Sequence, residues 1–68
     1  MKTVSGKELC QILEQKGWML ARVTGSHHIY IKQGTTYRIT IPVHGKNDLK
    51  IGLLKAIMKI ADIDESEL

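Results

Sequence analysis

Three histidines are the residues of this chain best suited to chemistry, and all three lie at the edges of expected strands. His27 and His28 stand in the run GSHHIY (25–30), and His44 stands in the run ITIPVHG (39–45). An unperturbed imidazole titrates near pH ~6.5, so histidine can act as an acid or a base at neutral pH. Any acid–base catalysis by this chain is therefore expected at these two runs.

The residues around the histidines do not call for a metal or another cofactor. The chain has no cluster of carboxylates suited to Mg²⁺ and no Cys/His spacing typical of a zinc site. A zinc site made by the three histidines together stays open as an alternative. We expect no cofactor.

Positive charge is concentrated in the body of the chain. Four acidic residues crowd the last seven positions, which leaves ten Lys and Arg against three acidic residues in 1–61, a net charge of +7. Such a field favours a polyanion such as RNA, or an acidic protein partner. Solubility alone would also account for the lysines.

Helical signals stand at both ends of the chain. Ser5 and Glu8 form a capping box that predicts a helix over 6–16, with Gly17 as its stop. A second helix is expected after an N-cap at Asn47 or Asp48. Residues 64–68 are expected to be a frayed acidic end.

Three extended segments, 18–24, 27–33 and 36–43, are separated by two glycine-containing turns. The order α-β-β-β-α predicts an α+β fold with two helices on one face of a three-stranded antiparallel sheet. This is the architecture of double-stranded-RNA-binding domains. The length of 68 residues allows one domain, 1–68, in which 63–68 form the acidic tail.

Period-two alternation predicts an aliphatic face of the sheet and an opposite face able to stack a base and hold phosphates. The second face would carry Tyr30, Lys32, Arg38 and Thr40. The same alternation places His27 on the apolar face and His28 on the open one. A bulge at the turn 25–26 could re-aim His27, or His27 could emerge at the open end of the sheet. Otherwise His28 would be the active residue.

The single cysteine, Cys10, cannot form an internal disulfide, which favours a reducing cytoplasm. The N-terminus lacks a signal-peptide pattern, and no apolar run approaches the ~20 residues needed to cross a bilayer. We expect a cytoplasmic protein without a membrane partner.

From Ser5 to about Ile63 the chain resembles the HicA, or YcfA-like, family of bacterial toxins. The resemblance is carried by GSH at 25–27, an aromatic at Tyr30, IPVHG at 41–45, and Leu49, Lys50, Gly52 and Leu53 or Leu54 leading into a basic helix. The chain departs from the family pattern at Leu53, where Thr is frequent, and at Ala61-Asp62, where Ala-Gly is frequent.

The resemblance implies a small mRNA interferase with a double-stranded-RNA-binding-like fold, neutralised by a HicB antitoxin. The family's catalytic histidine corresponds to His27, and Ser26, His28 and His44 are candidates for support. An endoribonuclease can use the 2′-hydroxyl of RNA as its nucleophile, so a histidine and nearby cations suffice without a metal. The expected RNA contacts are Tyr30, Lys32, Arg38, Lys46 and Lys50. The alternative is a non-catalytic RNA-binding or partner-binding module of the same fold.

Overall fold

The first helix, α1 (Gly6–Gln15), begins at the predicted capping box. In the computed structural model, which describes residues 3–68, the Ser5 hydroxyl accepts a hydrogen bond from the Glu8 amide at 3.2 Å. The Glu8 carboxylate accepts one from the Ser5 amide at 3.4 Å. Gly17 follows the helix with a φ of 94°, a conformation that favours glycine. The predicted first helix is confirmed.

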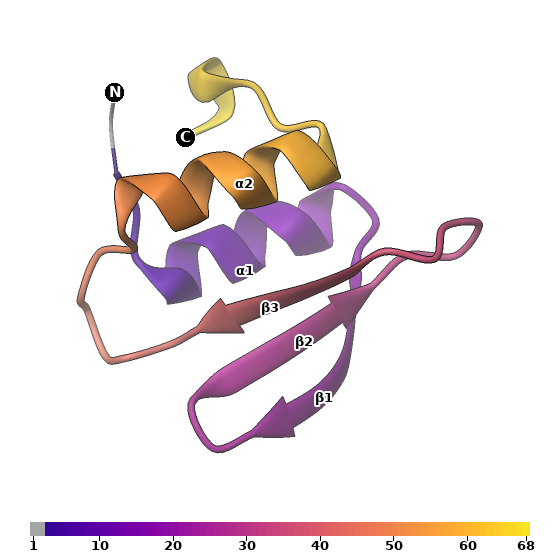
Figure 1. Cartoon of the computed structure of the whole chain (residues 1–68), viewed down its shortest axis with the longest axis horizontal. Helices are drawn as coiled ribbons and strands as arrows, with labels where there is room; N and C mark the ends of the chain where they lie inside the picture. Colours follow the sequence, from indigo (N-terminus) through magenta and orange to yellow (C-terminus); the bar gives the residue numbers. More distant parts are fainter. Residues whose placement is uncertain (1–2) are drawn as a thin grey trace.

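The three strands, β1 (Met19–Thr24), β2 (His27–Ile31) and β3 (Arg38–Pro42), form the predicted antiparallel sheet. Strand β2 lies in the centre, between β1 and β3 (Figure 1). Strand β3 ends at Pro42, which has no amide hydrogen to donate to a further ladder bond.

The two faces of β3 are as predicted, with Ile39 and Ile41 in the core and Arg38 and Thr40 outside, but those of β2 are reversed. In the central strand Tyr30 faces the helices and pairs with Ile39, while His28 pairs with Ile41. Tyr30, Ile39 and Ile41 are each at most 1% exposed. His27 does share a face with Ile29 and Ile31, as predicted, but this is the open face of the sheet and not the core face.

Tyr30 can occupy the core because its hydroxyl finds a partner at the rim. The hydroxyl donates to a carboxylate oxygen of Glu14 on α1 at 2.6 Å. Burial, the bond to Glu14 and the neighbouring Cys10 all raise the pKa of Tyr30, so the phenol stays neutral. The aromatic ring thus fills the core without leaving a buried polar atom unpaired.

Strand β1 contains a β-bulge. Leu20 pairs with Tyr30 but Arg22 pairs with Ile29, so Ala21 is the extra residue. A bulge shifts the alternation of side chains by one position. Consequently Leu20 faces the helices while Arg22 faces the opposite side.

The second helix, α2 (Ile51–Ala61), begins later than predicted. Its N-cap is Lys50, so neither predicted cap, Asn47 or Asp48, is correct. Asp48 is engaged elsewhere, because its carboxylate accepts a hydrogen bond from the Thr3 hydroxyl at 2.9 Å. The neighbouring Leu49 amide also donates to the Val4 carbonyl at 2.9 Å. These bonds tie the loop to the N-terminal segment before the helix can start.

Both helices contribute to one core on the same face of the sheet, as predicted. Leu9 and Leu13 of α1 and Leu54 and Ile57 of α2 are at most 3% exposed and belong to one cluster with Tyr30. In Figure 1, α2 lies beside α1 and β3 borders the helices. No helix in the described residues is long and apolar enough to cross a membrane.

The acidic end is ordered and not frayed. Asp62 ends α2 with a φ of 55°, the left-handed conformation that the glycine frequent in the family adopts easily. Ile63 is then buried, and a 3-10 helix, η1 (Glu65–Glu67), follows. The Glu67 carboxylate forms an ion pair with Lys16, the C-cap of α1, which lowers the pKa of Glu67.

Candidate active site

The open face of the sheet is the surface that points away from α1. Directly paired residues of antiparallel strands project to the same side, so the face consists of three rows. The rows are Thr24–His27–Pro42, Arg22–Ile29–Thr40 and Met19–Ile31–Arg38.

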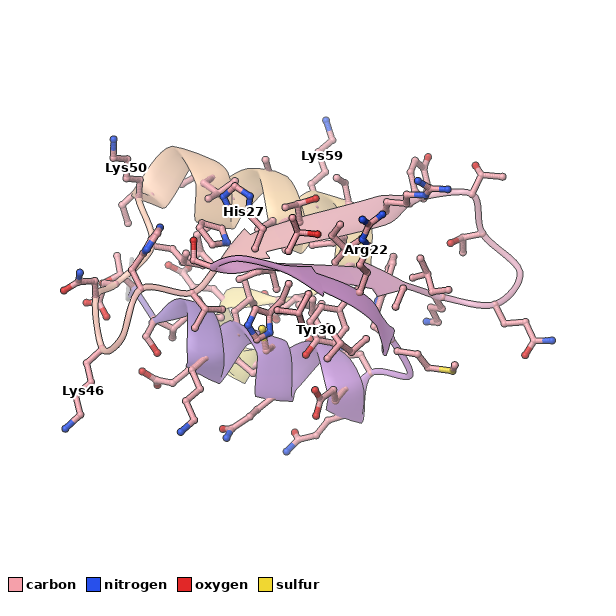
Figure 2. The ribbon with its side chains drawn as sticks, turned by 90° about the horizontal axis from the view of Figure 1, so that it is seen from below. Arg22, His27, Tyr30, Lys46, Lys50 and Lys59 are labelled. Carbon is pink, nitrogen blue, oxygen red and sulfur yellow. The ribbon has the colours of Figure 1, made fainter. Side chains whose placement is uncertain are left out.

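His27 is the first residue of β2 and lies in the end row of the open face. Its side chain is exposed and points away from α1, opposite to that of Tyr30 (Figure 2). The strand is fixed here because the Ser26 carbonyl accepts a hydrogen bond from the Val43 amide at 2.7 Å. Neither a bulge at the turn nor an opening at the rim is needed to expose His27.

His28 lies on the other face of the sheet. It is half-buried and lines a pocket of about 280 Å³ against α1, together with Glu14 and Tyr30. His44 is exposed and follows Pro42, the partner of His27, by two residues. It therefore belongs to the same end of the sheet as His27. In residues 3–68 no three His, Cys, Asp or Glu residues are grouped so that they could hold a metal, which argues against the zinc alternative.

Arg22 is a site residue that the sequence interpretation missed. The bulge at Ala21 places it in the row next to His27, and both side chains point to the same side of the sheet in Figure 2. In β2 the two rows are represented by His27 and Ile29, which are two residue steps or about 7 Å apart along the strand. The sequence did contain a sign of the bulge. Strict alternation from Leu20 would have placed Arg22 on the core face of the sheet, where charged residues are rare.

The predicted RNA-binding residues do not lie together. Tyr30 is wrong as a base-stacking residue because its ring is buried. Arg38 is exposed in the third row of the open face. The Lys32 ammonium lies 6.0 Å from the centre of the Trp18 ring, a cation–π contact at the end of the core.

The remaining predicted lysines divide between the two sides of the sheet (Figure 2). Lys50 points to the side of His27, whereas Lys46 points to the side of α1. Lys59 of α2, which was not among the predicted contacts, points to the side of His27. Of the labelled lysines, Lys50 and Lys59 thus point to the side of the sheet on which His27 lies.

Among the described residues, the three strands that form the open face contain no Asp or Glu. Glu8 and Glu14 belong to α1, and Glu67 is paired with Lys16, the C-cap of this helix. An anion approaching the open face therefore meets an exposed imidazole and guanidinium without a carboxylate of the sheet.

This arrangement can move protons and stabilise negative charge. An exposed imidazole can take up or give a proton, and Arg22 can interact with an anion held beside it. Thr40, in the same row as Arg22, adds an exposed hydroxyl that can donate a hydrogen bond. The combination suits a phosphate ester.

A comparison with curated proteins gives no match. A family model described as the HicA toxin of bacterial toxin–antitoxin systems matches residues 6–63 of the 68. The matched segment runs from the first residue of α1 through the sheet to the buried Ile63 and includes all three histidines. Since it takes in the whole α-β-β-β-α core as well as the candidate site, the chain belongs to the HicA family of toxins of bacterial toxin–antitoxin systems.

Proposed function

We propose that this toxin is a metal-independent endoribonuclease that cleaves mRNA with His27 as general acid or base. The carrying observation is the placement of His27, exposed in the end row of a carboxylate-free sheet face and next to the row of Arg22. His28 is half-buried on the other face, which favours His27 over His28 as the catalytic residue.

The reaction needs two proton transfers and no external nucleophile. A base removes the proton of the ribose 2′-hydroxyl, and the resulting oxyanion attacks the adjacent phosphorus. The bond from phosphorus to the 5′-oxygen breaks, and an acid protonates that oxygen. The products are a 2′,3′-cyclic phosphate and a 5′-hydroxyl, so no water is consumed.

His27 would carry one of these protons, and His44 at the same end of the sheet is the candidate for the other. Arg22 would stabilise the additional negative charge on phosphorus in the transition state. Ser26, partly exposed in the turn before β2, would hydrogen-bond the phosphate or the imidazole. Lys50 and Lys59 would hold flanking phosphates.

The partner would be a HicB-like antitoxin that covers the open face. A protein that blocks His27 and matches the charge of Arg22, Arg38 and Lys50 should carry an acidic contact patch. We further propose that 1–68 act as a single domain in the cytoplasm.

The test is incubation of purified wild type with a long single-stranded RNA in EDTA, beside His27→Ala and the matched control His28→Ala. We expect cleavage by wild type and His28→Ala only, with cyclic phosphate at the new 3′ ends. His28→Ala must also pass a folding check by circular dichroism, since His28 is half-buried.

Two outcomes would contradict the proposal. Equal cleavage by wild type and His27→Ala would remove His27 from the mechanism. Intact RNA in all samples, with mobility shifts that vanish at high salt, would instead identify a non-catalytic RNA-binding module.

A further inference from the structure

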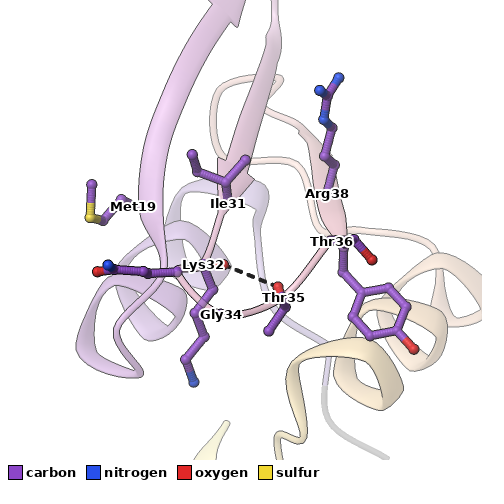
Figure 3. Close-up of a pocket in the computed structure, with 9 residues that line it drawn as sticks. Met19, Ile31, Lys32, Gly34, Thr35, Thr36 and Arg38 are labelled. Atoms are coloured by element: carbon purple, nitrogen blue, oxygen red, sulfur yellow. Dashed lines mark hydrogen bonds between the residues drawn. The ribbon is translucent and has the colours of Figure 1, made fainter.

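A pocket of about 600 Å³ opens at the far end of the open face from His27. It is formed by Met19, Ile31 and Arg38, the third row of the open face, and by the β2–β3 loop. Figure 3 shows Ile31 between Met19 and Arg38, with the loop below them held by a hydrogen bond from the Thr35 hydroxyl to the Lys32 carbonyl. The pocket is therefore continuous with the face that carries His27.

Three exposed apolar side chains line this pocket. Tyr37 is 60% exposed, Met19 61% and Ile31 39%. A hollow that combines apolar side chains with a few polar and charged groups is a candidate binding site. Here the apolar side chains include an aromatic ring and are flanked by the cations Lys32 and Arg38.

An aromatic ring beside cations is the combination that binds single-stranded nucleic acid. Bases stack on aromatic side chains, while arginine and lysine contact the phosphates. Tyr30 cannot serve as a stacking residue because it is buried, and Tyr37 is the exposed tyrosine of the described residues. An acidic protein segment would match the cations but would leave the exposed ring without a stacking partner.

The distance between the pocket and His27 determines how many nucleotides of a bound RNA lie between them. Ile31 is four residues after His27 in β2, which corresponds to about 13 Å along the strand. With a rise of about 3.4 Å per stacked nucleotide, this distance is spanned by about four nucleotides, and by fewer in a stretched strand. Arg22 and Thr40 line the path between the two ends.

We propose that this pocket binds one base of a single-stranded RNA, two to four nucleotides from the bond cleaved at His27. Tyr37 stacks on the base and Arg38 contacts its phosphate. The inference rests on the proposed ribonuclease function and adds to it a base-binding subsite that positions the RNA relative to His27.

The test is an abasic scan of a short oligoribonucleotide that wild type cleaves at one bond. A set of oligonucleotides lacks one base each, at successive positions on both sides of that bond. For wild type, we expect removal of one base two to four nucleotides away to lower kcat/KM by about 5- to 150-fold, the loss of one stacking contact. Tyr37→Ala should cleave the intact oligonucleotide more slowly by a similar factor and should be insensitive to that missing base.

Two variants serve as controls. Tyr37→Phe keeps the ring and should retain both the rate and the sensitivity to the missing base. Val23→Ala removes another exposed apolar side chain, 51% exposed and outside the open face, and should behave like wild type. Thermal unfolding of Tyr37→Ala should match wild type because the residue contributes little to the core.

Three results would overturn the inference. No position-dependent loss with wild type, or the same loss with Tyr37→Ala, would remove the subsite while leaving cleavage by His27 intact. Unchanged RNA cleavage by Tyr37→Ala together with failed neutralisation by the antitoxin would assign the pocket to a protein partner. Absence of cleavage by wild type would overturn the inference together with the function on which it rests.

Discussion

The two faces of the sheet are built from the same three strands and differ in almost every physical property. The face toward the helices holds Tyr30, Ile39 and Ile41, which are essentially without solvent contact. The open face holds His27, Arg22 and Arg38, all exposed and without a strand carboxylate nearby. In β2 the two histidines are adjacent in sequence and fall on opposite faces. In a domain this small, side-chain alternation, shifted by one bulge in β1, separates the residues that stabilise the fold from those available to a ligand.

The largest effect that tests this contrast is expected from Arg22→Gln. If Arg22 stabilises negative charge at the phosphorus, its loss should lower kcat for RNA cleavage by about 10²-fold. Arg38→Gln, at the far row of the same face, should raise KM and leave kcat nearly unchanged. Initial rates at saturating and limiting RNA separate the two. Equal effects on kcat would mean that the open face acts only as a diffuse positive field.

The next effect concerns the close contact that fixes β3 against α1. A Cβ atom at Gly6 would lie 2.3 Å from the Pro42 carbonyl oxygen, which is backbone and cannot move aside cheaply. We expect Gly6→Ala to lower the free energy of unfolding by about 1–3 kcal/mol. Because Pro42 pairs with His27, RNA cleavage should fall as well.

Gly52 provides the matched control for this substitution. It lies in α2 with no atom within 4 Å of an added Cβ, so Gly52→Ala should stabilise by about 0.5–1 kcal/mol. Urea unfolding of both variants gives the comparison. A neutral Gly6→Ala would show that the junction of α1 and β3 is loose.

A smaller effect is expected from Tyr30→Phe on the core face. The change removes the hydroxyl bond to Glu14 and keeps the buried ring, so the loss of stability should be about 1 kcal/mol. RNA cleavage should be unchanged, because Tyr30 is buried on the face opposite His27. A large loss of cleavage in a stably folded Tyr30→Phe would contradict the division of the faces.

The smallest effect is expected at the acidic end, which is held on α1 and away from the open face. The folded-state pKa of Glu67 is lowered, chiefly by the bond to Lys16. The ion pair therefore stabilises the fold at pH values above the ordinary Glu pKa, and this stabilisation is lost as the pH falls through the lowered pKa. Lys16→Met should therefore melt slightly below wild type at pH 7 and together with it in acid. A difference that persists in acid would point to packing by the lysine stem.

Most of the fold could be predicted from local signals. The capping box at Ser5, the positive φ at Gly17 and the end of β3 at Pro42 each follow from the chemistry of one or two residues. The start of α2 could not be predicted in this way. Asp48 is a good N-cap by type, but its carboxylate bonds to Thr3, 45 residues away in sequence.

The orientation of β2 could not be predicted, because one of its faces carries Ile29 and Ile31 and the other carries the aromatic ring of Tyr30. Alternation correctly grouped His27 with Ile29 and Ile31 but could not tell which group lies inside. In the structure Tyr30 lies inside and its hydroxyl bonds to Glu14 of α1, a contact between residues 16 apart in sequence that depends on the docking of this helix. With Tyr30 inside, alternation places His27 on the open face.

The extra residue in β1 changes how this strand should be treated in mutagenesis or redesign. Met19 and Arg22 face one way and Leu20 and Val23 the other, so the strand carries two phases joined at Ala21. A scan that assumes strict alternation would assign the residues of half of the strand to the wrong face of the sheet. Deleting Ala21 would restore strict alternation along β1. The residues on one side of the deletion would then change faces, so that either Arg22 pointed toward the helices or Leu20 pointed to the open face.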